Sequence, residues 1–135
     1  MLLVDTNVLA YLLIHGDHTE AAQELRKRDS DWRSESFLLA EFTNVLASSI
    51  AAKRITLSVA QSLLTTATAL FDGKLARMNH ASVLATASRH RVSAYDARFL
   101  ALAQQLNRRL VTEDAKLRAA APSLTQSLAD ALANV

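Results

Sequence analysis

The first dozen residues join a continuous apolar run to a helical pattern through a single carboxylate. Leu2 to Val4 contain no polar residue, which is typical of a strand that is covered on both faces. Thr6 is the predicted N-cap of the helix that follows, whose apolar residues recur at spacings of three and four. Ligands of parallel α/β sheets bind beyond the carboxyl ends of the strands, so Asp5 lies where chemistry is expected.

Apolar residues recur at helical spacing in the later segments as well. A capping box of Asp17 and Glu20 predicts the start of the second helix, and Thr56 and Asn79 are predicted N-caps further along. Gly73 is a predicted helix stop. The second predicted helix ends at about residue 28. The later predicted helices cover 37–53, 57–71, 80–89 and a segment from near 96 to 107, and a helical turn covers 115–119. The inner face of the 57–71 helix is predicted to consist of Val59, Leu63, Leu64, Ala67 and Leu70.

Two further segments have the composition of strands. They are Trp32 to Glu35, with a weak signal, and Arg109 to Thr112, which again ends in a hydroxyl residue followed by acids. Residues 74–78 are predicted to be a short connection. Residues 122–133 fit either an edge strand or a helix after Pro122, and the pattern does not decide between them.

Two carboxylates interrupt predicted apolar stripes. Glu41 comes three residues after Leu38 and four before Val45, so it needs a cation, or it lies at the edge of the stripe beside an arginine or water. Asp96 shares a helical face with Phe99 and the apolar residues beyond it, although a helix cap would also explain it.

Composition narrows the class of protein. The chain has 135 residues, half of them hydrophobic, with two glycines and one proline, which predicts one helix-rich domain over residues 1–135. The absence of cysteine excludes disulfides and thiolate metal sites and suits a reducing cytoplasm. Leu2 to Val4 is too short for a signal peptide or a membrane span, so we expect a soluble, cytoplasmic protein without membrane contact.

Charge is distributed unevenly around a net value of +2. Residues 1–73 carry −3 and residues 74–118 carry +6, which indicates an anionic partner such as nucleic acid, although any single arginine of this segment is better explained as part of a solvated helix face. The histidines form no zinc-binding pattern. The tryptophan and the phenylalanines are predicted core residues, namely Trp32, Phe37, Phe42, Phe71 and Phe99. We therefore expect arginine–phosphate contacts, rather than base stacking, to set the affinity for a nucleic-acid partner.

Asp5, Glu41, Asp96 and Asp114 each end a strand, start a helix or interrupt an apolar stripe. If the strands before Asp5 and Glu113 are parallel neighbours, their carboxyl ends share one edge of the sheet. Carboxylates gathered there repel one another unless a cation neutralises them. Oxygen ligands favour Mg²⁺ or Mn²⁺, and such a site supports phosphodiester hydrolysis by activated water.

Four segments together resemble the acidic motifs of PIN-domain ribonucleases, and in particular of the VapC-type toxins of bacterial toxin–antitoxin pairs. In order, these segments read LVDTNVL at 3–9, LAEFTNVL at 39–46, AYDARFLALA at 94–103 and LVTED at 110–114. The resemblance spans about residues 2–117. It implies a three-layer α/β/α domain with a central, mostly parallel sheet, and RNA cleavage that depends on Mg²⁺ or Mn²⁺.

The resemblance also implies roles for single residues. Asp5, Glu41, Asp96 and Asp114 match the metal-coordinating acids, and Thr112 matches a catalytic-site position whose hydroxyl orders the site or its water. Supporting positions are matched by Thr6, Asn7 and Asn44, whereas Glu113 falls at a variable position. A homodimer, a cognate antitoxin protein that blocks the site, and an RNA substrate of the tRNA or rRNA class are the implied partners.

Two other functions compete with this interpretation. A PIN-like module that binds RNA or protein without cleaving it is disfavoured by the complete acidic set. A phosphotransfer enzyme of the haloacid dehalogenase type would also place Asp5 after a strand. That class has a second aspartate two positions later, where this chain has Asn7.

Overall fold

The computed structural model describes residues 1–135 and contains one five-stranded sheet in which every pairing is parallel. The strands lie in the order β3-β2-β1-β4-β5. Their bounds are β1 (Leu2–Val4), β2 (Trp32–Glu35), β3 (Leu75–Ala76), β4 (Leu110–Val111) and β5 (Thr125–Gln126). The chain therefore starts in the middle of the sheet and completes one side of it before the other.

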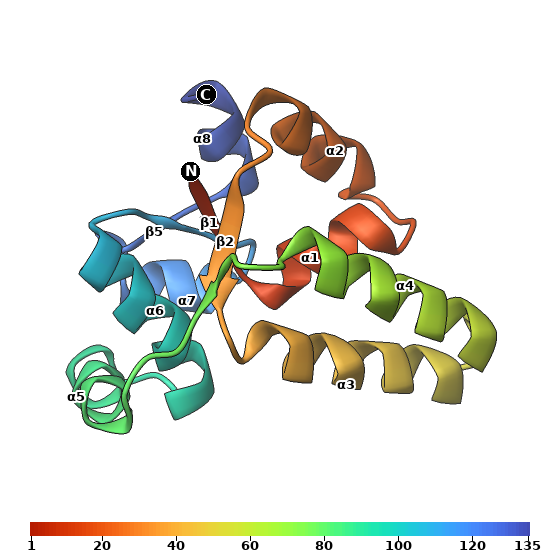
Figure 1. The fold of residues 1–135 in the computed structure, drawn as a ribbon. Helices are drawn as coiled ribbons and strands as arrows, with labels where there is room; N and C mark the ends of the chain where they lie inside the picture. Colours follow the sequence, from red (N-terminus) through yellow and green to blue (C-terminus); the bar gives the residue numbers. More distant parts are fainter.

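Helices cover both faces of this sheet. They are α1 (Thr6–Leu13), α2 (Thr19–Arg28), α3 (Leu38–Ala51), α4 (Leu57–Leu70), α5 (His80–His90), α6 (Ala94–Leu106), α7 (Ala115–Ala120) and α8 (Leu128–Ala133). Figure 1 shows α1 to α4 on one side of the sheet and α5 to α7 on the other. The predicted three-layer α/β/α architecture is confirmed. No helix is long and apolar enough to cross a membrane.

The register of the central strands brings the two acidic strand ends together. Leu3 lies opposite Leu110 and Val4 opposite Val111, so Asp5 and Thr112 follow at the same edge of the sheet. The amide of Asp5 continues the ladder by donating to the carbonyl of Val111 at 3.3 Å. The expectation that these strands are parallel neighbours is correct.

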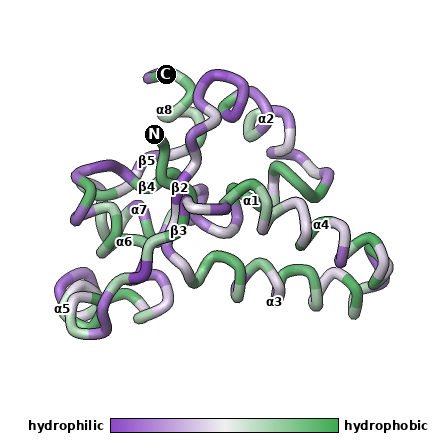
Figure 2. The backbone as a smooth tube through the Cα atoms, in the orientation of Figure 1, coloured by the Kyte–Doolittle hydropathy of each residue, from purple (hydrophilic) through white to green (hydrophobic).

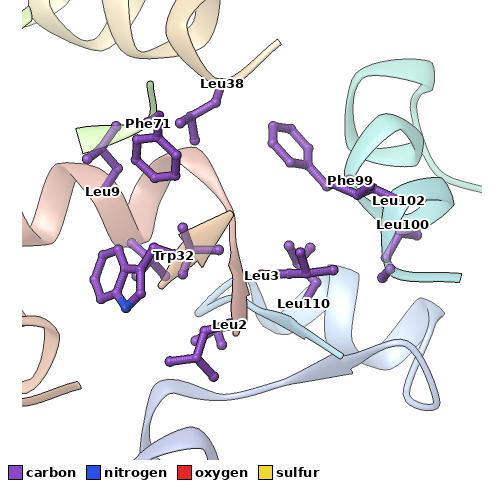
Figure 3. Close-up of a cluster of buried hydrophobic side chains, with 14 of the residues drawn as sticks. Leu2, Leu3, Leu9, Trp32, Leu38, Phe71, Phe99, Leu100, Leu102 and Leu110 are labelled. Carbon is purple, nitrogen blue, oxygen red and sulfur yellow. The ribbon is translucent and has the colours of Figure 1, made fainter. Parts of the chain in front are cut away.

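A continuous apolar core on both faces holds these strand ends in place. Figure 3 shows Leu9, Phe71 and Trp32 on one side of the strands and Phe99, Leu100 and Leu102 of α6 on the other. All of them are at most 3% exposed. Figure 2 shows α2 as the most hydrophilic helix beside the sheet, whereas α3 is apolar along most of its length. The buried strands therefore form a rigid base for the residues at their ends.

Three helix starts differ from the sequence predictions. Asp5, rather than Thr6, caps α1, because its side chain accepts the Val8 amide at 3.0 Å. No capping box forms at Asp17 and Glu20; α2 begins at Thr19, whose hydroxyl accepts the Gly16 amide. Ser93 caps α6, which leaves the Asp96 carboxylate free in the first turn. At α1 and α6 an acceptor one to three residues from the predicted one satisfies a first-turn amide, whereas α2 has no side-chain cap.

The sequence also missed or misplaced a few elements. Residues 74–78 contain β3, whose two residues are too few for a recognisable pattern. Pro122 is followed by the short strand β5 and then by α8, so both alternatives for this region are partly correct. Val59 was expected on the inner face of α4 but is 46% exposed, since Ala60 faces the core instead, whereas Ala67 is buried as predicted.

Candidate active site

Four acidic side chains from four separate elements line one cleft at the carboxyl edge of the sheet. Asp5 follows β1, Glu41 and Asp96 lie in the first turns of α3 and α6, and Asp114 precedes α7. The cleft has a volume of about 460 Å³. Its other lining residues are Thr6, Asn7, Phe37, Ala40, Asn44, Val45, Tyr95, Phe99 and Leu117.

Two of the acids are fixed because they also cap helices. Oδ1 of Asp5 accepts the amide of Val8, and Oδ1 of Asp114 accepts the amide of Leu117 at 3.1 Å. Each carboxylate therefore faces the positive end of a helix, which favours negative charge. The β-strand-to-helix junction that begins with each acid is the local reason why these side chains point into the cleft.

Glu41 contacts a hydroxyl rather than a cation. Oγ1 of Thr6 donates to Oε1 of Glu41 at 2.7 Å, which joins α1 to α3 across the cleft. Burial raises the pKa of Glu41, the Thr6 hydrogen bond opposes this change, and the charge of Asp96 adds to it. Of the two alternatives for Glu41, the protein supplies no cation to it, and the carboxylate is only half-buried, which fits a position at the edge of the stripe.

Asp5 is the most buried member of the cluster, with 8% of its surface exposed. Burial raises its pKa to about 6, the Thr112 hydroxyl and the Val8 amide lower it, and the charges of Glu41 and Asp114 raise it further. The Thr112 side chain is itself fully buried and accepts the amide of Asp114 at 3.1 Å. Thr112 thus lies behind the cleft, where it links Asp5 to Asp114.

Asp96 completes the cluster from the other face of the sheet. Burial raises the pKa of Asp96, and the charge of Asp114 raises it further. None of the four acids forms an ion pair, although Glu35 pairs with Arg98 and Glu113 with Arg118 nearby. The cleft is therefore a concentration of negative charge that the chain leaves uncompensated.

Glu113 lies beside this cluster in sequence but not in contact with the cleft. Its carboxylate accepts the amide of Leu128 at 2.8 Å and lies 3.5 Å from Arg118. Glu113 therefore connects β4 to the start of α8.

The donor set suits a hydrated divalent ion. The four acids share the cleft, but no three acidic or histidine side chains converge closely enough to bind one ion together. Mg²⁺ is commonly held by one or two carboxylates while the remaining positions keep water. Oxygen donors, raised carboxylate pKa values and the lack of a protein cation all fit such an ion.

Two aromatic residues of the cleft were not recognised in the sequence. Phe37 was assigned to the core, but its ring is only half-buried and lines the cleft. Tyr95, which directly precedes Asp96, is 62% exposed and lines it as well. The position of Tyr95 next to a candidate ligand at a helix start was the one available signal.

Comparison with known proteins identifies the family. Residues 2–122 match the PIN domain. The chain belongs to the PIN domain family. This PIN domain also resembles the crystal structure of PAE2754 from Pyrobaculum aerophilum, with a TM-score of 0.78 and 22% sequence identity. The match covers 98% of this chain and 86% of that one, and it supports the fold. No curated protein matches the sequence.

Proposed function

We propose that this PIN domain is a divalent-metal-dependent endoribonuclease that hydrolyses RNA phosphodiester bonds. The observation that carries this proposal is the meeting of four carboxylates, from four elements, in one cleft without a cation from the chain. These carboxylates repel one another in the cleft, and a bound cation that also binds a phosphate would explain why they are gathered there.

Asp5, Glu41, Asp96 and Asp114 are the residues that would hold the ion, some of them through water. When bound, Mg²⁺ or Mn²⁺ would neutralise the phosphate and lower the pKa of a water molecule that attacks phosphorus. Thr6 orients Glu41 through its hydroxyl, and Thr112 fixes the backbone of Asp114. Asn7 and Asn44 line the cleft and supply amide groups that can bind a phosphate or ribose oxygen.

The basic segment supports an anionic polymer as the substrate. Residues 74–118 carry a net charge of +6, and they include α5 and α6. Arg89 and Arg91 are exposed at the end of α5, which packs against the helix that carries Asp96. Cations beside an acidic cleft can bind flanking phosphates while the metal binds the reacting one.

The motif resemblance supports a more specific role as the toxin of a toxin–antitoxin pair. On this proposal the enzyme acts in the cytoplasm on an RNA of the tRNA or rRNA class, and a cognate antitoxin blocks the acidic cleft. It also forms a homodimer. The uncharged helix α4 exposes Leu57 and Val59, at 61% and 46%, and provides apolar surface for such a contact.

Adjacent acids provide a sharp test of the enzymatic proposal. Asp114→Asn preserves the helix cap but removes a charge from the cleft, whereas Glu113→Gln changes the next residue outside it. With Mg²⁺ or Mn²⁺ and structured RNA, we expect wild type and Glu113→Gln to cleave and Asp114→Asn to be inactive. Binding without cleavage by the wild type, at any metal concentration, would support a non-catalytic module instead.

A further inference from the structure

Tyr95 presents an exposed aromatic ring at the rim of the acidic cleft. Tyr95 is 62% exposed, although the apolar residues Phe37 and Phe99 line the same cleft. It occupies the first turn of α6 directly before Asp96. A group bound at Asp96 and Asp114 would therefore lie within reach of this ring.

The protein fixes the Tyr95 ring from beneath. Tyr95 stacks on Phe37 with ring centroids 5.3 Å apart and an angle of 15° between the planes. The guanidinium carbon of Arg98 lies 5.0 Å from the Phe37 centroid. One face of Tyr95 is thus supported by a second ring, and the exposed surface remains available to a flat partner.

A buried carboxylate holds this support in position. Glu35, which is fully buried at the end of β2, accepts the amide of Phe37 at 3.1 Å and lies 3.5 Å from Arg98. The loop that carries Phe37 and the helix that carries Tyr95 are thereby joined to the same residue. Preorganisation of this kind reduces the entropy that a ligand would lose by ordering the rings.

We propose that Tyr95 is a stacking platform for one unpaired RNA base next to the phosphate that is cleaved. This inference rests on the proposed ribonuclease function and adds a positioning residue to its cleft. A base within a duplex has both faces covered by its neighbours, whereas an unpaired base can stack on an aromatic side chain. Tyr95 is therefore a positioning residue, separate from the acids that hold the ion.

The expected contribution follows from the strength of base–aromatic stacking. Loss of one such contact weakens binding by about 5- to 140-fold. Stacking tolerates any base, because every base has a flat face. Tyr95 should consequently favour unpaired RNA without selecting a particular sequence.

The test compares wild type, Tyr95→Phe and Tyr95→Ala. The probe is a short, fluorescently labelled single-stranded RNA, with its complementary duplex as the control, and Ca²⁺ replaces Mg²⁺ to slow cleavage. We expect Tyr95→Ala to bind the single strand about 5- to 140-fold more weakly, with the duplex unaffected and Tyr95→Phe unchanged. Equal melting temperatures would show that Tyr95→Ala remains folded.

A second arm replaces single nucleotides of the probe by abasic ones. At the stacked position, the abasic probe should bind wild type more weakly but cause no additional loss with Tyr95→Ala, since the same contact is already absent. Losses that add up, or equal binding by wild type and Tyr95→Ala, would overturn the stacking proposal while Mg²⁺-dependent cleavage by wild type still stands. Failure of wild type to bind or cleave any RNA would overturn both proposals.

Discussion

The hydroxyl of Thr6 donates a hydrogen bond of 2.7 Å to Glu41 and is the only protein group that stabilises this carboxylate through a side chain. The contact connects the first residue of α1 to the first turn of α3. It favours the ionised form of Glu41 within a site that otherwise raises the pKa of that group. Thr6 therefore favours the charged form of a candidate metal ligand.

Replacement of Thr6 tests this relationship. Thr6→Val keeps the shape of the side chain but removes the donor, so the pKa of Glu41 should rise further and metal binding should weaken on the acidic side. We expect cleavage at pH 6 to fall by about tenfold, with partial recovery at pH 8. Thr6→Ser, which retains the hydroxyl, is the control. An unchanged pH–rate profile in Thr6→Val would show that the contact has no functional role.

Asp96→Asn should separate activity from stability. On the proposed role of Asp96 as a direct metal ligand, we expect cleavage to fall by more than the roughly 10- to 100-fold that the loss of an outer-sphere partner causes. The raised pKa of Asp96 means that its charge destabilises the metal-free fold. Asp96→Asn should therefore melt at a higher temperature in EDTA, as measured by circular dichroism. Full activity in this variant would remove Asp96 from the site.

The stability of the metal-free protein should depend on the ionisation of Asp5. The pKa of Asp5 is raised from 3.8 in the unfolded chain to about 6 in the folded protein. Its contribution to the free energy of unfolding is therefore fully present below pH 3.8 and is lost as the pH rises through 6. The shift corresponds to about 3 kcal/mol. Urea unfolding in EDTA should show this decline between pH 4 and pH 7. Asp5→Asn, which keeps the cap on Val8, should have a flatter profile, and Mg²⁺ should restore wild-type stability at neutral pH.

Much of the site could be predicted because its acids lie at recognisable boundaries. The apolar run before Asp5 and the helical stripe around Glu41 are strong local signals. The sequence places helical segments between β1 and β4, as a parallel pair requires, but only the structure shows that the two strands pair. β3 was missed because two residues carry too little pattern. The stacking of Tyr95 on Phe37 joins separate elements, so no local periodicity could reveal it.

Neutralising Arg89 and Arg91 should weaken RNA binding and flatten its salt dependence. Each phosphate contact that is lost should reduce the slope of log affinity against log salt by about 0.7 for single-stranded RNA. The matched control is Lys53→Gln with Arg54→Gln, at the turn between α3 and α4. Both double variants remove two positive charges. Each pair also contains one residue with a positive φ, which is 58° for Lys53 and 56° for Arg91. Equal slopes for both double variants would show that the arginines are ordinary solvated surface.

The most direct test of the proposed metal-dependent ribonuclease activity is to measure RNA cleavage and the chemical ends of the products in one experiment. Wild type in Mg²⁺ or Mn²⁺ is compared with wild type in EDTA and with Asp5→Asn. We expect cleavage by wild type with metal alone, and products without a 2′,3′-cyclic phosphate, because water rather than the neighbouring 2′-hydroxyl attacks phosphorus. Cleavage that persists in EDTA and in Asp5→Asn, or that leaves cyclic ends, would contradict the assignment of the acidic cleft as the catalytic centre.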